Sequence, residues 1–148
     1  MVQANVAFQI FSLVTKVPIL LLQEHNSNAT DLMAAIAIIQ QWPRNTWFSP
    51  LQRALFLADR LHKIERESNG TFTIIKTKSD LDGFTKRRED NRRLTAGLLC
   101  IEGAHTFEGK LENVDLLFEA GIRCVGLSHF ADHEFGGSRH GTHMYGIT

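Results

Sequence analysis

The chain has 148 residues, which is the length of one domain and enough to bury a hydrophobic core. Lysine and arginine balance aspartate and glutamate, so the formal net charge is zero. This balance gives no general attraction to nucleic acid or to an anionic membrane. The one candidate targeting segment, residues 6–22, is interrupted by Gln9, Lys16 and Pro18 and lacks signal-peptide features. We therefore expect no membrane span and predict a cytoplasmic protein.

The first half of the chain predicts one strand and two helices. Residues 5–15 are apolar and rich in β-formers, which is typical of a strand buried on both faces. The elements expected next are a loop over 16–30, a helix over 31–41 capped by Thr30, and a helix that begins at Ser49-Pro50 and ends at Asn69-Gly70. An apolar stripe on the second helix should face the core; it comprises Leu51, Ala54, Leu55, Ala58, Leu61 and Ile64.

The second half alternates between strand and helix patterns. The expected elements are a strand over 71–76, a short helix from a Ser79 cap to about Arg88, a strand over 96–101, a helix over 111–120 and a strand over 122–128. Such alternation is typical of βα units and a parallel sheet. From His129 to Thr148 the chain has no clear period, and we expect a partly exposed loop there. Cys100 and Cys124 each lie in an apolar run and are predicted to be buried free thiols.

Two polar residues follow predicted strands directly. Glu102 comes after the run 98–101, and His129 comes after the run 125–128. Ligands of α/β proteins gather at the carboxyl ends of the strands, so adjacent parallel strands should place both side chains at one rim of the sheet. Each residue taken alone is compatible with a structural role, as a helix-capping acid or a hydrogen-bonded histidine. Together they suggest a shared site, with Glu102 as a metal-binding carboxylate.

The remaining histidines give weaker signals. His133, His140 and His143 have spacings that would bind a metal only on a helix, and the glycines around them disfavour a helix. Their role stays open. His105 follows Glu102 in a predicted loop, and we expect it to have a structural role.

The stretches 97-GLLCIEGAH-105 and 111-LENVDLLFEAGIRCVGLSHF-130 resemble the membrane (renal) dipeptidases, zinc peptidases of the amidohydrolase superfamily. That family has a glycine-led strand ending in Glu-Gly and an Arg-led strand ending in Leu-Thr-His. Here Leu127-Ser128-His129 carries serine in place of threonine, and the closing residues 146–148 also match. The resemblance implies an α/β fold of the (β/α)8 TIM-barrel type with two zinc ions at the rim.

The resemblance also implies roles for the two strand-end residues. Glu102 falls where the family has the carboxylate that bridges both zinc ions. His129 falls where the family has a catalytic histidine that binds the substrate and polarises its scissile carbonyl. The implied reaction is hydrolysis of a dipeptide by metal-activated water.

Much of the family's pattern is missing from the sequence. No His-x-Asp metal pair occurs before residue 95, and the family's later histidines, arginine and aspartate have no counterpart. We therefore expect residues 1–148 to be the N-terminal to middle part of one barrel domain, without its first strand and second half. Alone, such a chain should have little or no activity and should associate with itself or with the missing segment. The alternative is a non-enzymatic remnant that serves in binding or association.

Overall fold

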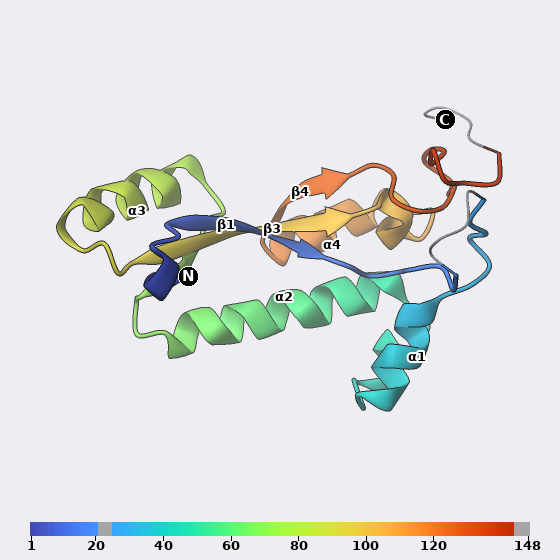
Figure 1. Cartoon of the computed structure of the whole chain (residues 1–148), viewed down its shortest axis with the longest axis horizontal. Helices are drawn as coiled ribbons and strands as arrows, with labels where there is room; N and C mark the ends of the chain where they lie inside the picture. Colours follow the sequence, from blue (N-terminus) through green and yellow to red (C-terminus); the bar gives the residue numbers. More distant parts are fainter. Residues whose placement is uncertain (21–24, 144–148) are drawn as a thin grey trace.

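The computed structural model describes residues 1–20 and 25–143, and within them it contains a four-stranded parallel sheet (Figure 1). The strands are β1 (Phe8–Leu13), β2 (Phe72–Ile74), β3 (Thr95–Glu102) and β4 (Ile122–Gly126). The α-helices are α1 (Leu32–Ile39), α2 (Pro50–Glu67), α3 (Lys78–Asp90) and α4 (Asn113–Glu119), and the 3-10 turns are η1 (Val2–Ala4), η2 (Arg44–Thr46) and η3 (Ala104–Phe107). No helix of the described part is long and apolar enough to cross a membrane.

Strand β3 is the centre of the sheet. One of its edges pairs with β1 from Phe8↔Ala96 to Leu13↔Ile101. Its other edge is shared, because β2 pairs with Thr95–Gly97 and β4 pairs with the half that ends at Glu102. All three pairings are parallel, so the carboxyl ends of β1, β3 and β4 point the same way, toward the tail after β4 (Figure 1).

The helices α2 and α4 cover the same face of the sheet. The main core joins Leu99 and Ile101 of β3 to Ala54 and Ala58 of α2 and to Leu117 of α4. Helix α3 reaches the other face at the start of β3, where Phe84 clusters with Ala96 (Figure 1). An open parallel sheet whose strands do not close on themselves, with strands and helices alternating along the chain, is what part of a (β/α)8 barrel provides. The fold class is therefore α/β with a partial barrel, as the sequence predicted.

Apart from the contact with α3, the described residues leave much of the opposite face of the sheet uncovered. Side chains alternate along β3, so Leu98, Cys100 and Glu102 point away from the core that holds Leu99 and Ile101. Their register partners on β1 share this face, and Ile10 is 56% exposed there. The prediction that residues 5–15 form a strand buried on both faces is therefore wrong: β1 is an edge strand with one face open.

A close packing contact explains the glycine in the middle of β3. A Cβ atom on Gly97 would lie 2.4 Å from a ring carbon of Phe11. The Phe11 ring meets Phe72 edge to face, with 5.8 Å between centroids, so the space above Gly97 is filled by this aromatic pair. The contact helps fix β1 and β2 on opposite edges of β3.

Helix starts differ in detail from the sequence prediction. Ser49 does cap α2, with Pro50 in the first turn. The cap of α1 is Asp31 rather than Thr30, and the cap of α3 is Thr77 rather than Ser79. In both cases the observed cap and the predicted cap have side chains that can accept the same hydrogen bonds, and they lie one or two positions apart. Sequence pattern alone does not decide between two such neighbours.

The apolar stripe predicted on α2 is confirmed for most of its length. Leu51, Ala54 and Ala58 are buried, whereas Ile64 is 54% exposed. Ile64 lies in the last turns of α2, beyond the packed middle of the helix, so the periodic pattern overestimates the extent of the buried face.

A buried arginine holds the carboxyl end of β1 to the helices. Arg53 of α2 is fully buried. Its guanidinium donates hydrogen bonds to the carbonyl oxygens of Thr15 and Thr46 (2.7 Å each) and of Trp47. It also forms a 2.7 Å ion pair with Asp31, whose other carboxylate oxygen caps α1. One side chain therefore joins β1, α1, η2 and α2.

Arg53→Ala should lower the free energy of unfolding by about 3–5 kcal/mol, because it removes one partner of a buried ion pair and leaves carbonyl groups unsatisfied. Arg53→Lys should recover only part of this, since an ammonium cannot match the planar fork of donors. The measurement is urea unfolding followed by circular dichroism. Arg66→Ala on the same helix, where the side chain is 64% exposed, is the matched control and should change stability by less than about 0.5 kcal/mol. Equal effects of the two alanine variants would contradict the role of Arg53.

Candidate functional site

Glu102 and His129 meet at the carboxyl ends of β3 and β4. Glu102 is the last residue of β3 and pairs with Gly126, the last residue of β4. The chain then turns so that His129 Nε2 lies 3.2 Å from Glu102 Oε2. The side chain of His129 is 24% exposed and that of Glu102 is 37% exposed, so the pair is reachable from solvent. The structure thus brings together the two residues that the sequence singled out.

The contact leaves one imidazole nitrogen unused. His129 Nδ1 is buried and has no hydrogen-bond partner among the described residues. The ring packs against Phe130 with 3.7 Å between centroids. Burial lowers the pKa of His129, and the charge of Glu102 opposes this shift. An unsatisfied buried nitrogen is uncommon in folded proteins, and a catalytic role is one of its known explanations.

His105 lies below this rim in a closed polar cluster. Its Nε2 is 3.1 Å from Thr15 Oγ1, which in turn is 2.7 Å from Thr106 Oγ1. Burial, with smaller effects from His133, Lys16 and other nearby basic groups, lowers the pKa of His105 to about 3. The imidazole is therefore neutral at physiological pH. The predicted structural role fits these contacts better than metal binding does.

The tail after β4 is irregular, as predicted, but it is more ordered than an exposed loop. His133 is buried, and its Nε2 donates to the carbonyl oxygen of Leu127 (2.7 Å) while its Nδ1 accepts from the amide of Phe135. Asp132 is also buried and accepts hydrogen bonds from the amides of Ser138 and His143. His133 therefore has a structural role, and nothing in the sequence signalled the organising role of Asp132.

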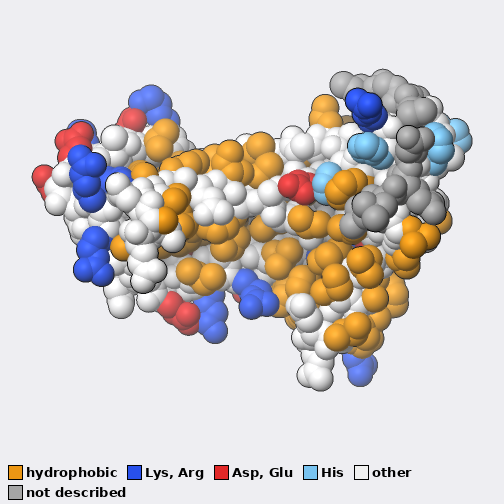
Figure 2. All heavy atoms as spheres, viewed as in Figure 1, with side chains coloured by type: hydrophobic (Ala, Val, Ile, Leu, Met, Phe, Trp, Pro, Cys, Tyr) orange, Lys and Arg blue, Asp and Glu red, His pale blue; other side chains and the backbone are white. Residues whose placement is uncertain are grey.

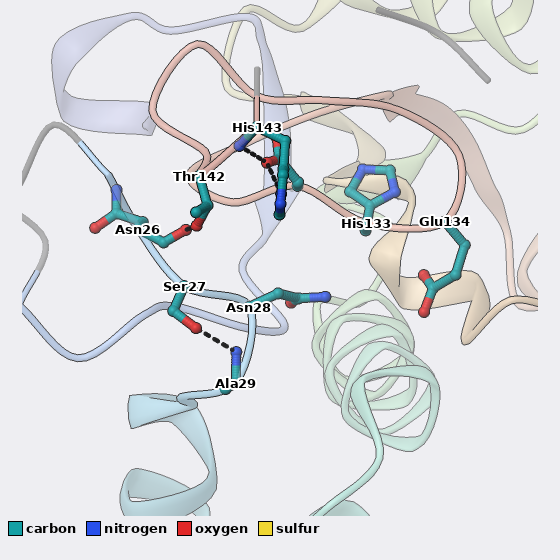
Figure 3. Close-up of a pocket in the computed structure, with 9 residues that line it drawn as sticks. Asn26, Ser27, Asn28, Ala29, His133, Glu134, Thr142 and His143 are labelled. Atoms are coloured by element: carbon teal, nitrogen blue, oxygen red, sulfur yellow. Dashed lines mark hydrogen bonds and ion pairs between the residues drawn. The ribbon is translucent and has the colours of Figure 1, made fainter. Parts of the chain in front are cut away.

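A polar pocket of about 370 Å³ lies between this tail and the loop after β1. Figure 3 shows Asn26, Ser27 and Asn28 on one side of it and His133 and Glu134 on the other. Histidine side chains also gather at this end of the molecule in Figure 2. Glu102 and His129 do not line the pocket. The sequence predicted nothing here, because the pocket is formed by two loops that are far apart along the chain.

The two cysteines differ in their surroundings. Cys100 is buried, whereas Cys124 is exposed, so the prediction of two buried thiols is wrong for Cys124. The physical reason is that Cys124 lies on β4, on the uncovered face of the sheet. Burial raises the pKa of the Cys100 thiol to about 11, and the neighbouring Cys124 thiol acts in the same direction.

The residues present do not complete a metal site. Within the described part of the chain, no three His, Cys, Asp or Glu side chains lie where they could jointly hold a metal ion. Catalytic zinc takes three protein ligands and structural zinc takes four. Glu102 offers a carboxylate and His129 an unused nitrogen, which is fewer than either kind of site requires.

The chain belongs to the membrane dipeptidase family, peptidase family M19, whose family model matches residues 6–146. This confirms the resemblance seen in the sequence, although its closing residues 146–148 lie outside the described part. No curated protein matches the chain significantly.

Two solved structures show the same fold. The dipeptidase AC, a metallopeptidase of family M19, aligns with a TM-score of 0.54 and 18% identity over 82% of this chain and 30% of its own. A metallopeptidase from Rhodobacter sphaeroides, bound to a phosphinate mimic of the dipeptide L-Ala-D-Ala, aligns with a TM-score of 0.56 and 19% identity over 86% of this chain and 34% of its own. The chain thus spans about a third of the length of these relatives.

The neutral state of His105 predicts a pH dependence of stability. An unfolded histidine takes up a proton near pH 6.5, whereas His105 in the folded chain does so only near pH 3. Between these values the unfolded state binds more protons, so stability falls as the pH is lowered from about 6.5, by up to about 1.4 kcal/mol per pH unit from this group. Urea unfolding at several pH values measures the slope.

His105→Asn should have a shallower slope between pH 6.5 and pH 4 than the unchanged chain. A part of the slope will remain, because burial lowers the pKa of His129 as well. The exposed His140 provides the control, and His140→Asn should keep the full slope. Equal slopes in the unchanged chain and in His105→Asn would contradict the buried neutral imidazole.

Proposed function

We propose that this chain supplies the Glu102–His129 part of the active site of a zinc-dependent dipeptidase. The observation that carries the proposal is the 3.2 Å contact between these side chains at neighbouring strand ends, in a chain of a metallopeptidase family. The proposed substrate is a dipeptide. The proposal includes a cytoplasmic location, and it takes residues 1–148 as the N-terminal to middle part of one barrel domain.

The two residues have different proposed roles. Glu102 is the metal-binding carboxylate, which its position at the solvent-reachable rim supports. His129 is the catalytic residue that contacts the dipeptide. Its Nε2 faces Glu102, so the carboxylate holds the ring in one orientation, while the buried Nδ1 is left unsatisfied by the described residues. Neither role requires the cluster around His105.

The isolated chain should have little or no activity, because its described residues offer too few zinc ligands. We expect the purified 148-residue chain to retain less than one equivalent of zinc after dialysis. Its hydrolysis of a dipeptide panel with added zinc should not exceed that of Glu102→Gln. Metal content by mass spectrometry and release of free amino acids are the measurements. Tight zinc together with hydrolysis that Glu102→Gln abolishes would contradict the incompleteness of the site.

The DNA on either side of the coding sequence separates the enzyme from a remnant. A reading frame that continues through a His-x-Asp motif upstream and two spaced histidines downstream supports the enzyme. In that longer protein, Glu102→Gln should lower kcat/KM at least about a hundredfold, by the loss of a metal ligand, while Glu112→Gln should leave it unchanged. Stop codons on both sides, or a longer protein whose hydrolysis is unaffected by Glu102→Gln, would overturn the proposal.

The uncovered face of the sheet favours a second candidate function, in association. Ile10 and Phe8 on β1 are 56% and 37% exposed and belong to one face of an open sheet edge. Hydrophobic side chains, orange in Figure 2, also occupy much of the visible surface over the middle of the molecule. Such a face is a candidate for contact with a second copy of the chain.

Self-association predicts that the unchanged chain sediments faster as its concentration rises. Ile10→Lys should shift the equilibrium toward the monomer, because it places a charge on the uncovered face. Ile64→Lys is the matched control, since Ile64 is 54% exposed but lies on α2, away from that face. A chain that is monomeric at all concentrations, or equal effects of the two lysine variants, would contradict association through this face.

A further inference from the structure

Cys100 and Cys124 are direct register partners on neighbouring parallel strands. Cys100 lies on β3 and Cys124 on β4, next to an irregularity of the ladder between Leu99 and Cys100. Paired strands lie about 4.8 Å apart, and disulfides join Cα atoms separated by about 4.4–6.8 Å. Both cysteines are reduced, and the Cys124 thiol is near enough to raise the pKa of Cys100. The backbone therefore already holds them at a separation that a disulfide can span.

The two thiols differ in their access to solvent. Cys124 is exposed on the uncovered face of the sheet, whereas Cys100 is 9% exposed. A soluble oxidant therefore reaches Cys124 first. Cys100 lies directly beside the sulfur that has reacted, where a second thiol can resolve the product faster than a second oxidant molecule arrives.

We propose that Cys100 and Cys124 form an oxidisable dithiol that a hydroperoxide converts into an intrachain disulfide. The Cys124 sulfur attacks the peroxide; an S–O bond forms, the O–O bond breaks, and the leaving oxygen takes the thiol proton as an alcohol or water. The Cys100 sulfur then attacks the sulfenic acid; the S–S bond forms, the S–O bond breaks, and the hydroxyl leaves with the Cys100 proton as water. Two thiols lose two electrons, and the hydroperoxide gains them.

The bond would connect the two strands that carry the candidate site. The pair Cys100–Cys124 is followed along the strands by the pair Glu102–Gly126, and His129 comes three residues later. Oxidation would thus fix β3 to β4 directly beneath the Glu102–His129 contact. The dithiol does not depend on the proposed dipeptidase function, since it requires neither zinc nor substrate.

Trypsin gives a direct test, because it separates the two cysteines into the peptides 94–110 and 124–139. The dilute native chain is treated with hydrogen peroxide, the remaining thiols are alkylated, and the digest is analysed by mass spectrometry. We expect the intact chain to lose two hydrogen atoms and the two peptides to appear linked, with separate peptides restored by dithiothreitol. A linked pair found only in chain dimers, or oxygen addition without a link, would overturn the proposal.

Single variants test the order of the steps. In Cys100→Ala the sulfenic acid on Cys124 cannot be resolved, so dimedone should trap it on peptide 124–139. In Cys124→Ser, Cys100 should give no dimedone adduct at the same exposure to peroxide, because it is buried. Circular dichroism checks that both variants are folded. A dimedone adduct on Cys100 in Cys124→Ser, together with none on Cys124 in Cys100→Ala, would contradict the assignment of Cys124 as the attacked thiol.

Discussion

The parallel pairing of β3 with every other strand of the described sheet is the constraint on which the rest of the structure depends. Because β1 and β4 run parallel to β3 on its two edges, their carboxyl ends meet at one rim. Because side chains alternate along β3, Leu99 and Ile101 join the helices while Cys100 and Glu102 face the uncovered side. The Glu102–His129 contact and the cysteine pair both follow from this one register.

A glutamate at the end of an apolar strand raises the question of what compensates its charge. In this structure the carboxylate is about one-third exposed, and its Oε2 lies 3.2 Å from Nε2 of the His129 imidazole. This arrangement makes the acid tolerable without a metal. The same arrangement leaves His129 Nδ1 buried and without a hydrogen-bond partner among the residues that the structure describes, so the contact satisfies the glutamate but not the histidine. A contact with a purely structural role would not require an unsatisfied nitrogen on the histidine.

The parts of the fold that the sequence predicted are those with a repeating or local signal. The Ser49-Pro50 helix start, the alternation of strands and helices, and the two polar residues at strand ends all belong to this kind. The failures involve contacts between distant residues. The Arg53 network with Asp31 and Thr15 has no sequence signature, because its partners lie more than 20 residues away in the chain. The exposure of Cys124 and of β1 depends on which face of the sheet is covered, which a local apolar pattern does not encode.

The central claim is that β3 and β4 bring Glu102 and His129 together in this chain. Nuclear Overhauser contacts between the ring protons of His129 and the γ protons of Glu102 test it most directly. The account predicts such contacts, together with cross-strand contacts between Glu102 and Gly126. Ring contacts of His129 to residues of the tail alone, with none to Glu102, would contradict it.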